Sequence, residues 1–316
     1  MGKEPVMRIF PGELRRVMSA LEMELEHLEE IRLRAEQPLL VVWKGGEYFV
    51  SPEGNLTRQR AQAYRISGKL IKETVECISS HSLYAYEEEL KQGFLTIQGG
   101  HRIGVAGKMV MEDGKVRTIK HLSFLNIRLA HEIYGCADSI LPYLYGDQHQ
   151  ILHTLLISPP RCGKTTLLRD LIRQFSNGRE GYAGVCVGVV DERSEIGACY
   201  QGIPQNDLGI RTDVLDCCPK QIGMMMLIRT MSPDVVAVDE IGSRGDMEAM
   251  EYVMNCGCRL LASVHGASLD EIRRKPVLER MVREQWFERY VVLDRNGAVG
   301  HVAAVLDEQG RVLSCG

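Results

Sequence analysis

The sequence lacks the features that mark membrane-spanning and exported proteins. No stretch approaches the roughly 18 consecutive apolar residues that a membrane-spanning helix needs. The N-terminal residues MGKEPVMRIFPGELRR lack the apolar core of a signal peptide. We therefore expect a cytoplasmic protein with no direct membrane span, which could still dock on a membrane complex through partner proteins.

The ten cysteines lack the spacing of a metal site. The closest groups are Cys217-Cys218 and Cys256-Gly257-Cys258, and neither has the two intervening residues of a zinc ribbon or knuckle. Without an export signal, reduced thiols that pack as small apolar side chains are the favoured interpretation.

A surplus of basic residues is also missing. The net charge is -4; residues 1–134 carry 19 Lys and Arg against 18 Asp and Glu, and residues 135–316 carry 19 against 24. Nucleic-acid-binding domains have a clear excess of positive charge. We therefore expect no nucleic-acid partner.

A chain of 316 residues is long enough for two hydrophobic cores. Residues 1–134 combine short alternating strands with helical stretches at Pro11–Glu30, Ser67–Ser80 and Leu83–Lys91, which predicts a small α+β N-terminal domain.

From residue 135 a bridging helix is expected, and then strands and helices alternate, which predicts an α/β domain whose parallel sheet is covered on both faces. The tail predicts a C-terminal hairpin that turns at Asn296-Gly297. The predicted parallel strands are Ile151–Ile157, Val185–Val190, Val235–Val238 and Arg259–Val264.

A phosphate-binding loop joins the first of these strands to a helix, but its first glycine is missing. Residues 158–165 read SPPRCGKT, whereas the pattern is G-x-x-x-x-G-K-[ST]. Glycine is needed at Ser158 only if the turn there requires a positive φ. An extended start followed by Pro159 and Pro160, whose rings fix φ, can do without it. We expect the substitution to leave the site intact.

Each residue type in this loop has a physical role. Gly163 permits close approach of the backbone, Lys164 would reach the β- and γ-phosphates, and Thr165 would hold Mg²⁺. ATP and Mg²⁺ are the expected cofactors. The other loop residues expected to contact the nucleotide are Ser158, Pro159, Pro160, Arg161, Cys162 and Thr166.

Two acidic pairs follow, each at the end of a predicted strand: Asp191-Glu192 and Asp239-Glu240. Parallel sheets bind ligands at the carboxyl ends of their strands. We predict that Asp239 belongs to the metal shell and that Glu240 activates the attacking water. Asp191 would lie near the metal and Glu192 near the water. The alternative for both pairs is that they cap the helix that follows.

A histidine and several arginines complete the set of candidates. His265 ends the next predicted strand, where it would either sense the γ-phosphate or serve a purely structural role. Arginines that neutralise transition-state charge often come from another subunit. The residues alone do not rank the candidates, which are Arg102, Arg128, Arg193, Arg211, Arg229 and Arg244.

The order of these motifs resembles that of the type II/type IV secretion ATPase superfamily. Its Walker A, acidic, Walker B and histidine motifs are similar to SPPRCGKTTLLRD, DERSEIGA, IRTMSPDVVAVDEIG and SVHGAS. Within that superfamily the likeness is strongest to a branch of sporulation proteins from endospore-forming bacteria, which the first domain also resembles in EIRLRAEQPL, GGHRIGVAGK and SFLNIRLAHEI. The sequence departs from this superfamily at Asp239. Many secretion ATPases have Gly at this position, directly before the Walker B glutamate, which is Glu240 here.

The resemblance implies a RecA-like P-loop NTPase domain that assembles into a ring, usually a hexamer, with ATP between subunits. It favours His265 as the sensor and Arg102 and Arg128 as the inter-subunit contacts with the nucleotide. It also implies a cytoplasmic motor on the mother-cell side of a sporulation channel, with membrane proteins of that channel as partners. The alternatives are an ATPase stimulated by nucleic acid and an ATP-gated assembly module with little turnover.

Overall fold

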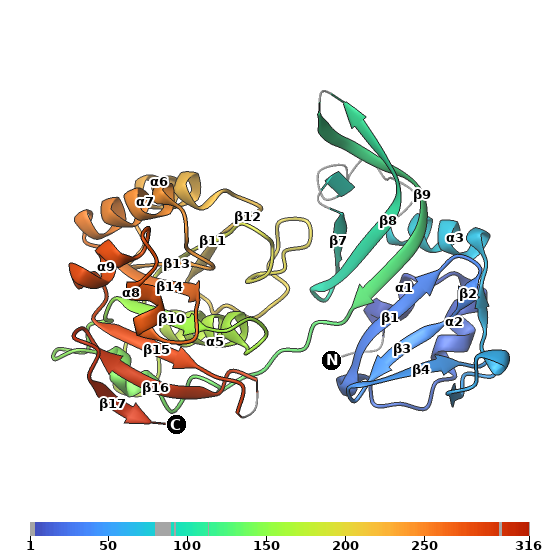
Figure 1. The fold of residues 1–316 in the computed structure, drawn as a ribbon, viewed down its shortest axis with the longest axis horizontal. Coiled ribbons are helices and arrows are strands. Elements are labelled where there is room, and N and C mark those ends of the chain that lie inside the picture. Colours follow the sequence, from blue (N-terminus) through green and yellow to red (C-terminus); the bar gives the residue numbers. More distant parts are fainter. Residues whose placement is uncertain (1–3, 80–89, 92, 113, 297–298, 316) are drawn as a thin grey trace. The chain divides into compact units, whose positions relative to one another are not determined.

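The computed structural model describes residues 4–79, 90–91, 93–112, 114–296 and 299–315 (Figure 1). The chain divides into two compact units, Met1–His131 and Glu132–Gly316, each with its own sheet. In the part of the chain that is described, no helix is long and apolar enough to cross a membrane.

The first unit is built on a seven-stranded antiparallel sheet in the order β5-β4-β3-β1-β9-β8-β7. β2 and β6 form a separate two-stranded sheet. The strands are β1 (Leu28–Arg34), β2 (Gln37–Pro38), β3 (Leu40–Trp43), β4 (Gly46–Val50), β5 (Leu56–Thr57), β6 (Arg65–Ile66), β7 (Phe94–Ile97), β8 (His101–Glu112) and β9 (Lys115–Arg128). The helices are α1 (Glu4–Arg8), α2 (Gly12–Ser19) and α3 (Gly68–Ile78).

Of the three helices predicted for this unit, the one at Ser67–Ser80 is confirmed by α3. The single helix predicted over Pro11–Glu30 is wrong, because α2 ends at Ser19 and β1 begins at Leu28. From Glu30 onward, partly exposed and buried residues alternate as the sheet requires. The predicted helix Leu83–Lys91 lies outside the described residues except for its last two.

The second unit contains an eight-stranded sheet in the order β12-β11-β13-β14-β10-β15-β16-β17. The first six strands of this order run parallel, and the last two are added antiparallel. The strands are β10 (Thr154–Ser158), β11 (Val187–Asp191), β12 (Thr212–Asp216), β13 (Val235–Val238), β14 (Arg259–His265), β15 (Arg289–Leu293), β16 (Val302–Asp307) and β17 (Val312–Cys315). The predicted parallel sheet is confirmed, with β12 as a strand that the sequence did not predict.

Helices cover both faces of this sheet. On one face, α5 (Lys164–Asn177) packs with the segment 137–145 over a core that includes Leu156, Val189 and Leu261. The core of the other face lies beneath α6 (Lys220–Thr230), α7 (Arg244–Asn255), α8 (Leu269–Arg273) and α9 (Glu279–Arg283). The predicted bridging helix is reduced to one 3-10 turn at Leu141–Leu144.

The antiparallel pair β15–β16 agrees with the predicted C-terminal hairpin, although Gly297 of the predicted turn lies outside the described residues. The hairpin extends the sheet beyond β15, which pairs in parallel with β10. As a result, the loop between β15 and β16 lies at the same edge of the sheet as the carboxyl end of β10.

Candidate nucleotide-binding site

The phosphate-binding loop lies between β10 and α5. Ser158 is the last residue of β10 and is fully buried, and its hydroxyl donates to the carbonyl of Pro159 at 2.8 Å. Since Ser158 has the extended backbone of a strand, no glycine is required there. The turns that do need the left-handed region come later, at Arg161 (φ 65°) and Gly163 (φ 84°), directly before α5 begins.

The outer side of the loop rests on the β15–β16 hairpin. The Gly300 N–H donates to the Cys162 carbonyl at 3.0 Å, and Arg295 Nη2 lies 3.5 Å from the Pro160 carbonyl. A Cβ atom on Gly163 would lie only 2.2 Å from Gly300 N. The loop and the hairpin are therefore in backbone contact that only glycine permits.

The side chain of Lys164 is buried and points at the acidic end of β13. Its Nζ lies 2.8 Å from Asp239 Oδ1 and 3.4 Å from Glu240 Oε1, but no described residue offers it a well-aligned hydrogen bond. A buried ammonium with unused N–H donors at a phosphate loop fits a nucleotide phosphate. The next helical residue, Thr165, donates its hydroxyl to Asp239 Oδ2 at 2.9 Å. This hydroxyl and carboxylate form the oxygen set that Mg²⁺ accepts alongside water and phosphate.

Asp239 is held in its charged form. Burial on its own would raise the pKa of Asp239, but Lys164 and the hydroxyls of Ser263 and Thr165 outweigh burial and lower it below its ordinary value. Ser263, on the neighbouring strand β14, donates its hydroxyl to Asp239 and accepts the Glu240 N–H at 3.0 Å. One serine therefore positions both residues of the acidic pair.

Glu240 has the backbone conformation of a strained site. Its φ is 53°, in the left-handed region that is unfavourable for a glutamate. Its carboxylate lies 2.9 Å from His265 Nε2 and 3.0 Å from Arg193 Nη1. His265 ends β14 directly beside Ser158, its partner in the parallel register. The structure therefore brings together the phosphate loop, the second acidic pair and the histidine.

The first acidic pair lies at the end of β11, next to β13. Both oxygens of the buried Asp191 are occupied by backbone N–H groups, those of Glu195, Ile196 and Gly197 at 2.8 Å each. Burial raises the pKa of Asp191 to about 6 against the lowering effect of these hydrogen bonds. Asp191 thus anchors the loop that follows β11, and its contribution to a metal site stays a prediction.

Glu192 accepts a hydrogen bond from Lys220 Nζ. Lys220 is buried at the start of α6, and nothing in the sequence singled it out, because a lysine in the first turn of a helix is usually solvated. Asp191, Glu192, Arg193, Glu195, Lys220, Asp239 and Glu240 together line a hollow of about 20 Å³. That volume has room for one water molecule.

The remaining predicted residues are distributed as follows. Thr166 lies in the first turn of α5, where its carbonyl faces the Cys136 thiol at 3.9 Å. Arg102 and Arg128 belong to the first unit, directly opposite each other on β8 and β9. Arg128 also lies 3.4 Å from Glu30, and the Arg102 guanidinium is stacked on the Phe94 ring.

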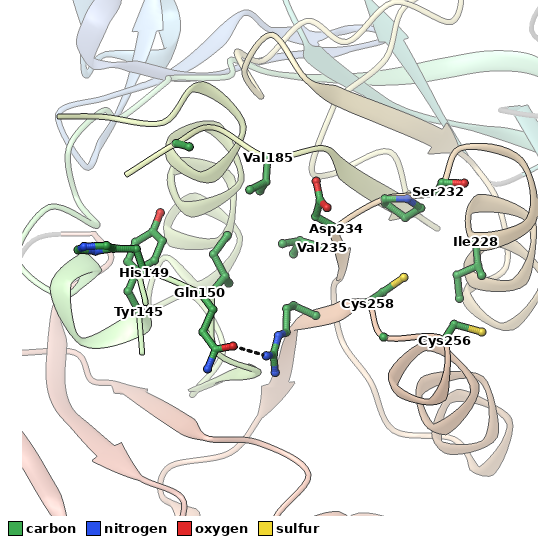
Figure 2. Close-up of a pocket in the computed structure, with 15 residues that line it drawn as sticks. Tyr145, His149, Gln150, Val185, Ile228, Ser232, Asp234, Val235, Cys256 and Cys258 are labelled. Atoms are coloured by element: carbon green, nitrogen blue, oxygen red, sulfur yellow. Dashed lines mark hydrogen bonds between the residues drawn. The ribbon is translucent and has the colours of Figure 1, made fainter. Parts of the chain in front are cut away.

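A larger hollow of about 500 Å³ lies at the opposite edge of the sheet (Figure 2). It is lined by the amino ends of β13 and β14 and by residues such as Tyr145, Asp234 and Cys258. Arg259 in its wall donates a hydrogen bond to Gln150 Oε1 at 3.0 Å, and its Nη1 lies 3.4 Å from Glu288 Oε2. Since open parallel sheets bind ligands at the carboxyl ends of their strands, we assign the candidate site to the phosphate-loop edge.

Comparisons with known proteins identify a family and agree with this fold. The family described as sporulation stage III, protein AA matches residues 1–313. Stage III sporulation protein AA of Bacillus subtilis (strain 168) is 40% identical over 310 residues, which span 98% of this chain and 96% of that protein.

Two solved structures share the fold at low sequence identity. The ATPase DotB of Legionella pneumophila matches with a TM-score of 0.58 and 14% identity, over 93% of this chain and 80% of DotB. The pilus retraction motor PilT with bound ADP matches with a TM-score of 0.55 and 14% identity, over 88% of this chain and 76% of PilT. The predicted RecA-like fold is thereby confirmed.

Proposed function

The chain belongs to the family of sporulation stage III protein AA, and we propose that it is a Mg²⁺-dependent ATPase, the cytoplasmic motor of a secretion-type channel between mother cell and forespore. The observation that carries the enzymatic part is the buried Lys164 ammonium. It lies at a phosphate loop, faces Asp239 and Glu240, and has hydrogen-bond donors to spare. A triphosphate is the ligand that would use these donors.

The hydrolysis site uses residues from three strand ends. Lys164 and the backbone N–H groups of the loop bind the β- and γ-phosphates, and Thr165 and Asp239 hold Mg²⁺. When bound, Mg²⁺ neutralises charge on the phosphate oxygens. Glu240 orients the attacking water and takes its proton, and His265 beside it senses the γ-phosphate.

The first acidic pair supports this arrangement from the neighbouring strand. Asp191 shapes the loop after β11, and through that loop it sets the position of Glu192 near the water. The hollow of about 20 Å³ between the two acidic pairs would hold this water.

The motor role calls for a ring, which we propose to be a hexamer. In a ring the contacts are head-to-tail, so the nucleotide edge of one subunit meets a different surface of its neighbour. Arg102 and Arg128 on the first unit are the residues that we propose to reach the nucleotide of the neighbouring subunit. Membrane proteins of the channel would hold the ring at the membrane on the mother-cell side.

The experiment is the rate of ATP hydrolysis per subunit as a function of protein concentration. Wild type is compared with Glu240→Gln and with Glu248→Gln, which removes an exposed carboxylate from α7. We expect a rate that rises with concentration, vanishes in Glu240→Gln and is unchanged in Glu248→Gln. A flat rate would contradict the shared site.

Activity that survives in Glu240→Gln would contradict the role of this glutamate and move the base to Glu192. ATP binding without hydrolysis at any concentration would instead favour an ATP-gated assembly module. Stimulation of the rate by single-stranded DNA would favour the nucleic-acid-linked alternative.

A further inference from the structure

Basic side chains contact both carboxylate oxygens of Glu240. Oε1 lies 2.9 Å from His265 Nε2 and 3.4 Å from Lys164 Nζ, whereas Oε2 lies 3.0 Å from Arg193 Nη1. A carboxylate that takes a proton from water needs an oxygen that faces the water. As arranged here, each oxygen of Glu240 already has a basic side chain beside it, which competes with the water for that oxygen.

Nucleotide binding at the phosphate loop would remove only part of this arrangement. The phosphates attract Lys164, and this weakens its contact with Oε1. Arg193 holds the other oxygen and belongs to a different loop, the one that follows β11. Some further event has to release Oε2.

Arg193 combines a fixed backbone with an exposed side chain. Three backbone N–H groups bind the Asp191 carboxylate and anchor the loop on both sides of Arg193. The Arg193 side chain is 64% exposed, compared with 25% for Glu240. Its guanidinium can therefore change partner by side-chain rotation, without rearrangement of the loop.

A γ-phosphate is a better partner for this guanidinium than a single carboxylate oxygen. The planar guanidinium binds phosphate through two parallel hydrogen bonds. Since the water activated by Glu240 attacks the γ-phosphate, that phosphate must lie next to the water that Glu240 contacts. An arginine in contact with Glu240 therefore has a γ-phosphate within the reach of its long side chain.

We propose that Arg193 is a γ-phosphate-dependent switch on Glu240 of its own subunit. Without nucleotide, and with ADP, Arg193 holds Oε2 and keeps Glu240 inactive. With ATP, Arg193 moves to the γ-phosphate, which frees Glu240 and adds positive charge where the transition state needs it. This inference rests on the proposed function, in that ATP binds at the loop and Glu240 activates water.

The first test compares affinities for ADP and for a non-hydrolysable ATP analogue, measured by calorimetry with Mg²⁺. In Arg193→Ala we expect the affinity for the analogue to fall about ten- to a hundredfold, as for the loss of one or two charge-assisted hydrogen bonds, and the affinity for ADP to change less than about twofold. Arg193→Lys should fall between the two, because lysine keeps the charge but not the paired donors. Arg283→Ala removes an exposed arginine of α9 and should alter neither affinity.

An unchanged ratio of the two affinities in Arg193→Ala would overturn the switch. An equal loss of affinity for both nucleotides would overturn it as well, because that result indicates a structural role. A rise in turnover with an unchanged ratio would mean that Arg193 only inhibits Glu240 and does not bind the γ-phosphate.

The second test decides whether Arg193 acts on its own subunit. Arg193→Ala subunits keep Glu240, and Glu240→Gln subunits keep Arg193. If both residues must lie in one subunit, mixing the two variants gives no more activity than their sum. Recovery of activity on mixing would show that Arg193 acts across a subunit boundary and would refute the proposal.

Wild type separates this inference from the proposed function. If wild type neither binds nor hydrolyses ATP, the proposed function itself is contradicted. If wild type hydrolyses ATP and Arg193→Ala has the same nucleotide affinities and the same rate as wild type, only the switch is contradicted.

Discussion

Gly163→Ala is the substitution whose effect can best be worked out from the backbone. Gly163 has φ 84°, where an alanine costs about 1 kcal/mol relative to glycine. The new Cβ would also lie 2.2 Å from Gly300 N and 2.7 Å from Val299 Cγ1, so the hairpin has to move away. That movement breaks the hydrogen bond from Gly300 N to the Cys162 carbonyl, worth about 1 kcal/mol. We expect a total loss of about 2–4 kcal/mol in the free energy of unfolding of the second unit.

Gly300→Ala is the matched control. Gly300 also has a positive φ, 83°, but a Cβ there would meet nothing closer than Cys136 at 3.8 Å. Alanine at this position should therefore cost only the backbone term, about 1 kcal/mol. The two variants differ in one respect, which is the overlap between the phosphate loop and the hairpin.

The assay is urea denaturation followed by tryptophan fluorescence. The chain has two tryptophans, Trp43 in the first unit and Trp286 in the second, so a Trp43→Phe background reports on the second unit alone. Saturating Mg²⁺-ATP should raise the transition midpoint of Gly300→Ala, as expected for a ligand that binds only the folded state, but not that of Gly163→Ala. Equal midpoints for the two variants, or retained stabilisation by ATP in Gly163→Ala, would refute the reasoning.

Two further predictions concern strain and pH. Since Glu240 has φ 53°, Glu240→Gly should be more stable than Glu240→Ala by about 1 kcal/mol in the same assay, although both variants lack the carboxylate; equal stabilities would mean that the backbone at this residue is not strained. In the first unit, burial and the nearby His131 lower the pKa of His101 to about 4 from an ordinary 6.5. The neutral, buried His101 therefore contributes stability that is fully present above pH 6.5 and is lost as the pH falls toward 4, by up to about 3 kcal/mol. Denaturation followed by Trp43 at several pH values should show this loss in wild type and a smaller one in His101→Gln, and an equal loss in both would assign the pH dependence to other groups.

The parallel strands were predictable because of their burial. Every residue of β10, β11 and β13 is buried, and strands covered on both faces are continuous apolar runs in the sequence. The edge strand β12 has the sequence TDVLD, pairs with β11 on one side only and contains no fully buried residue. Its composition resembles that of a loop, so pattern alone could not identify it.

The contacts within the candidate site were less predictable than its motifs. Lys220 pairs with Glu192 across 28 residues of sequence, and no local pattern links the two. Ser263 gave a weak signal as a hydroxyl within the apolar strand RLLASVH, but its two partners at the end of β13 depend on the strand order. Strand order is set by tertiary packing, which the local pattern of a single strand does not contain.

The charges around Lys164 bear on how the site could hydrolyse ATP. Three ion pairs form at the site. Lys164 pairs with Asp239, Arg193 pairs with Glu240, and Lys220 pairs with Glu192. These three cations of the site are thus paired with carboxylates of the same unit. A Mg²⁺-bound triphosphate still carries net negative charge, and its transition state spreads that charge over the γ-phosphate oxygens. The additional positive charge can come from Arg193 when it leaves Glu240, or from arginines outside the unit such as Arg102 and Arg128. If Arg193 supplies only part of this charge and Arg102 and Arg128 of a neighbouring subunit supply the rest, as we propose, the rate per subunit should depend on protein concentration.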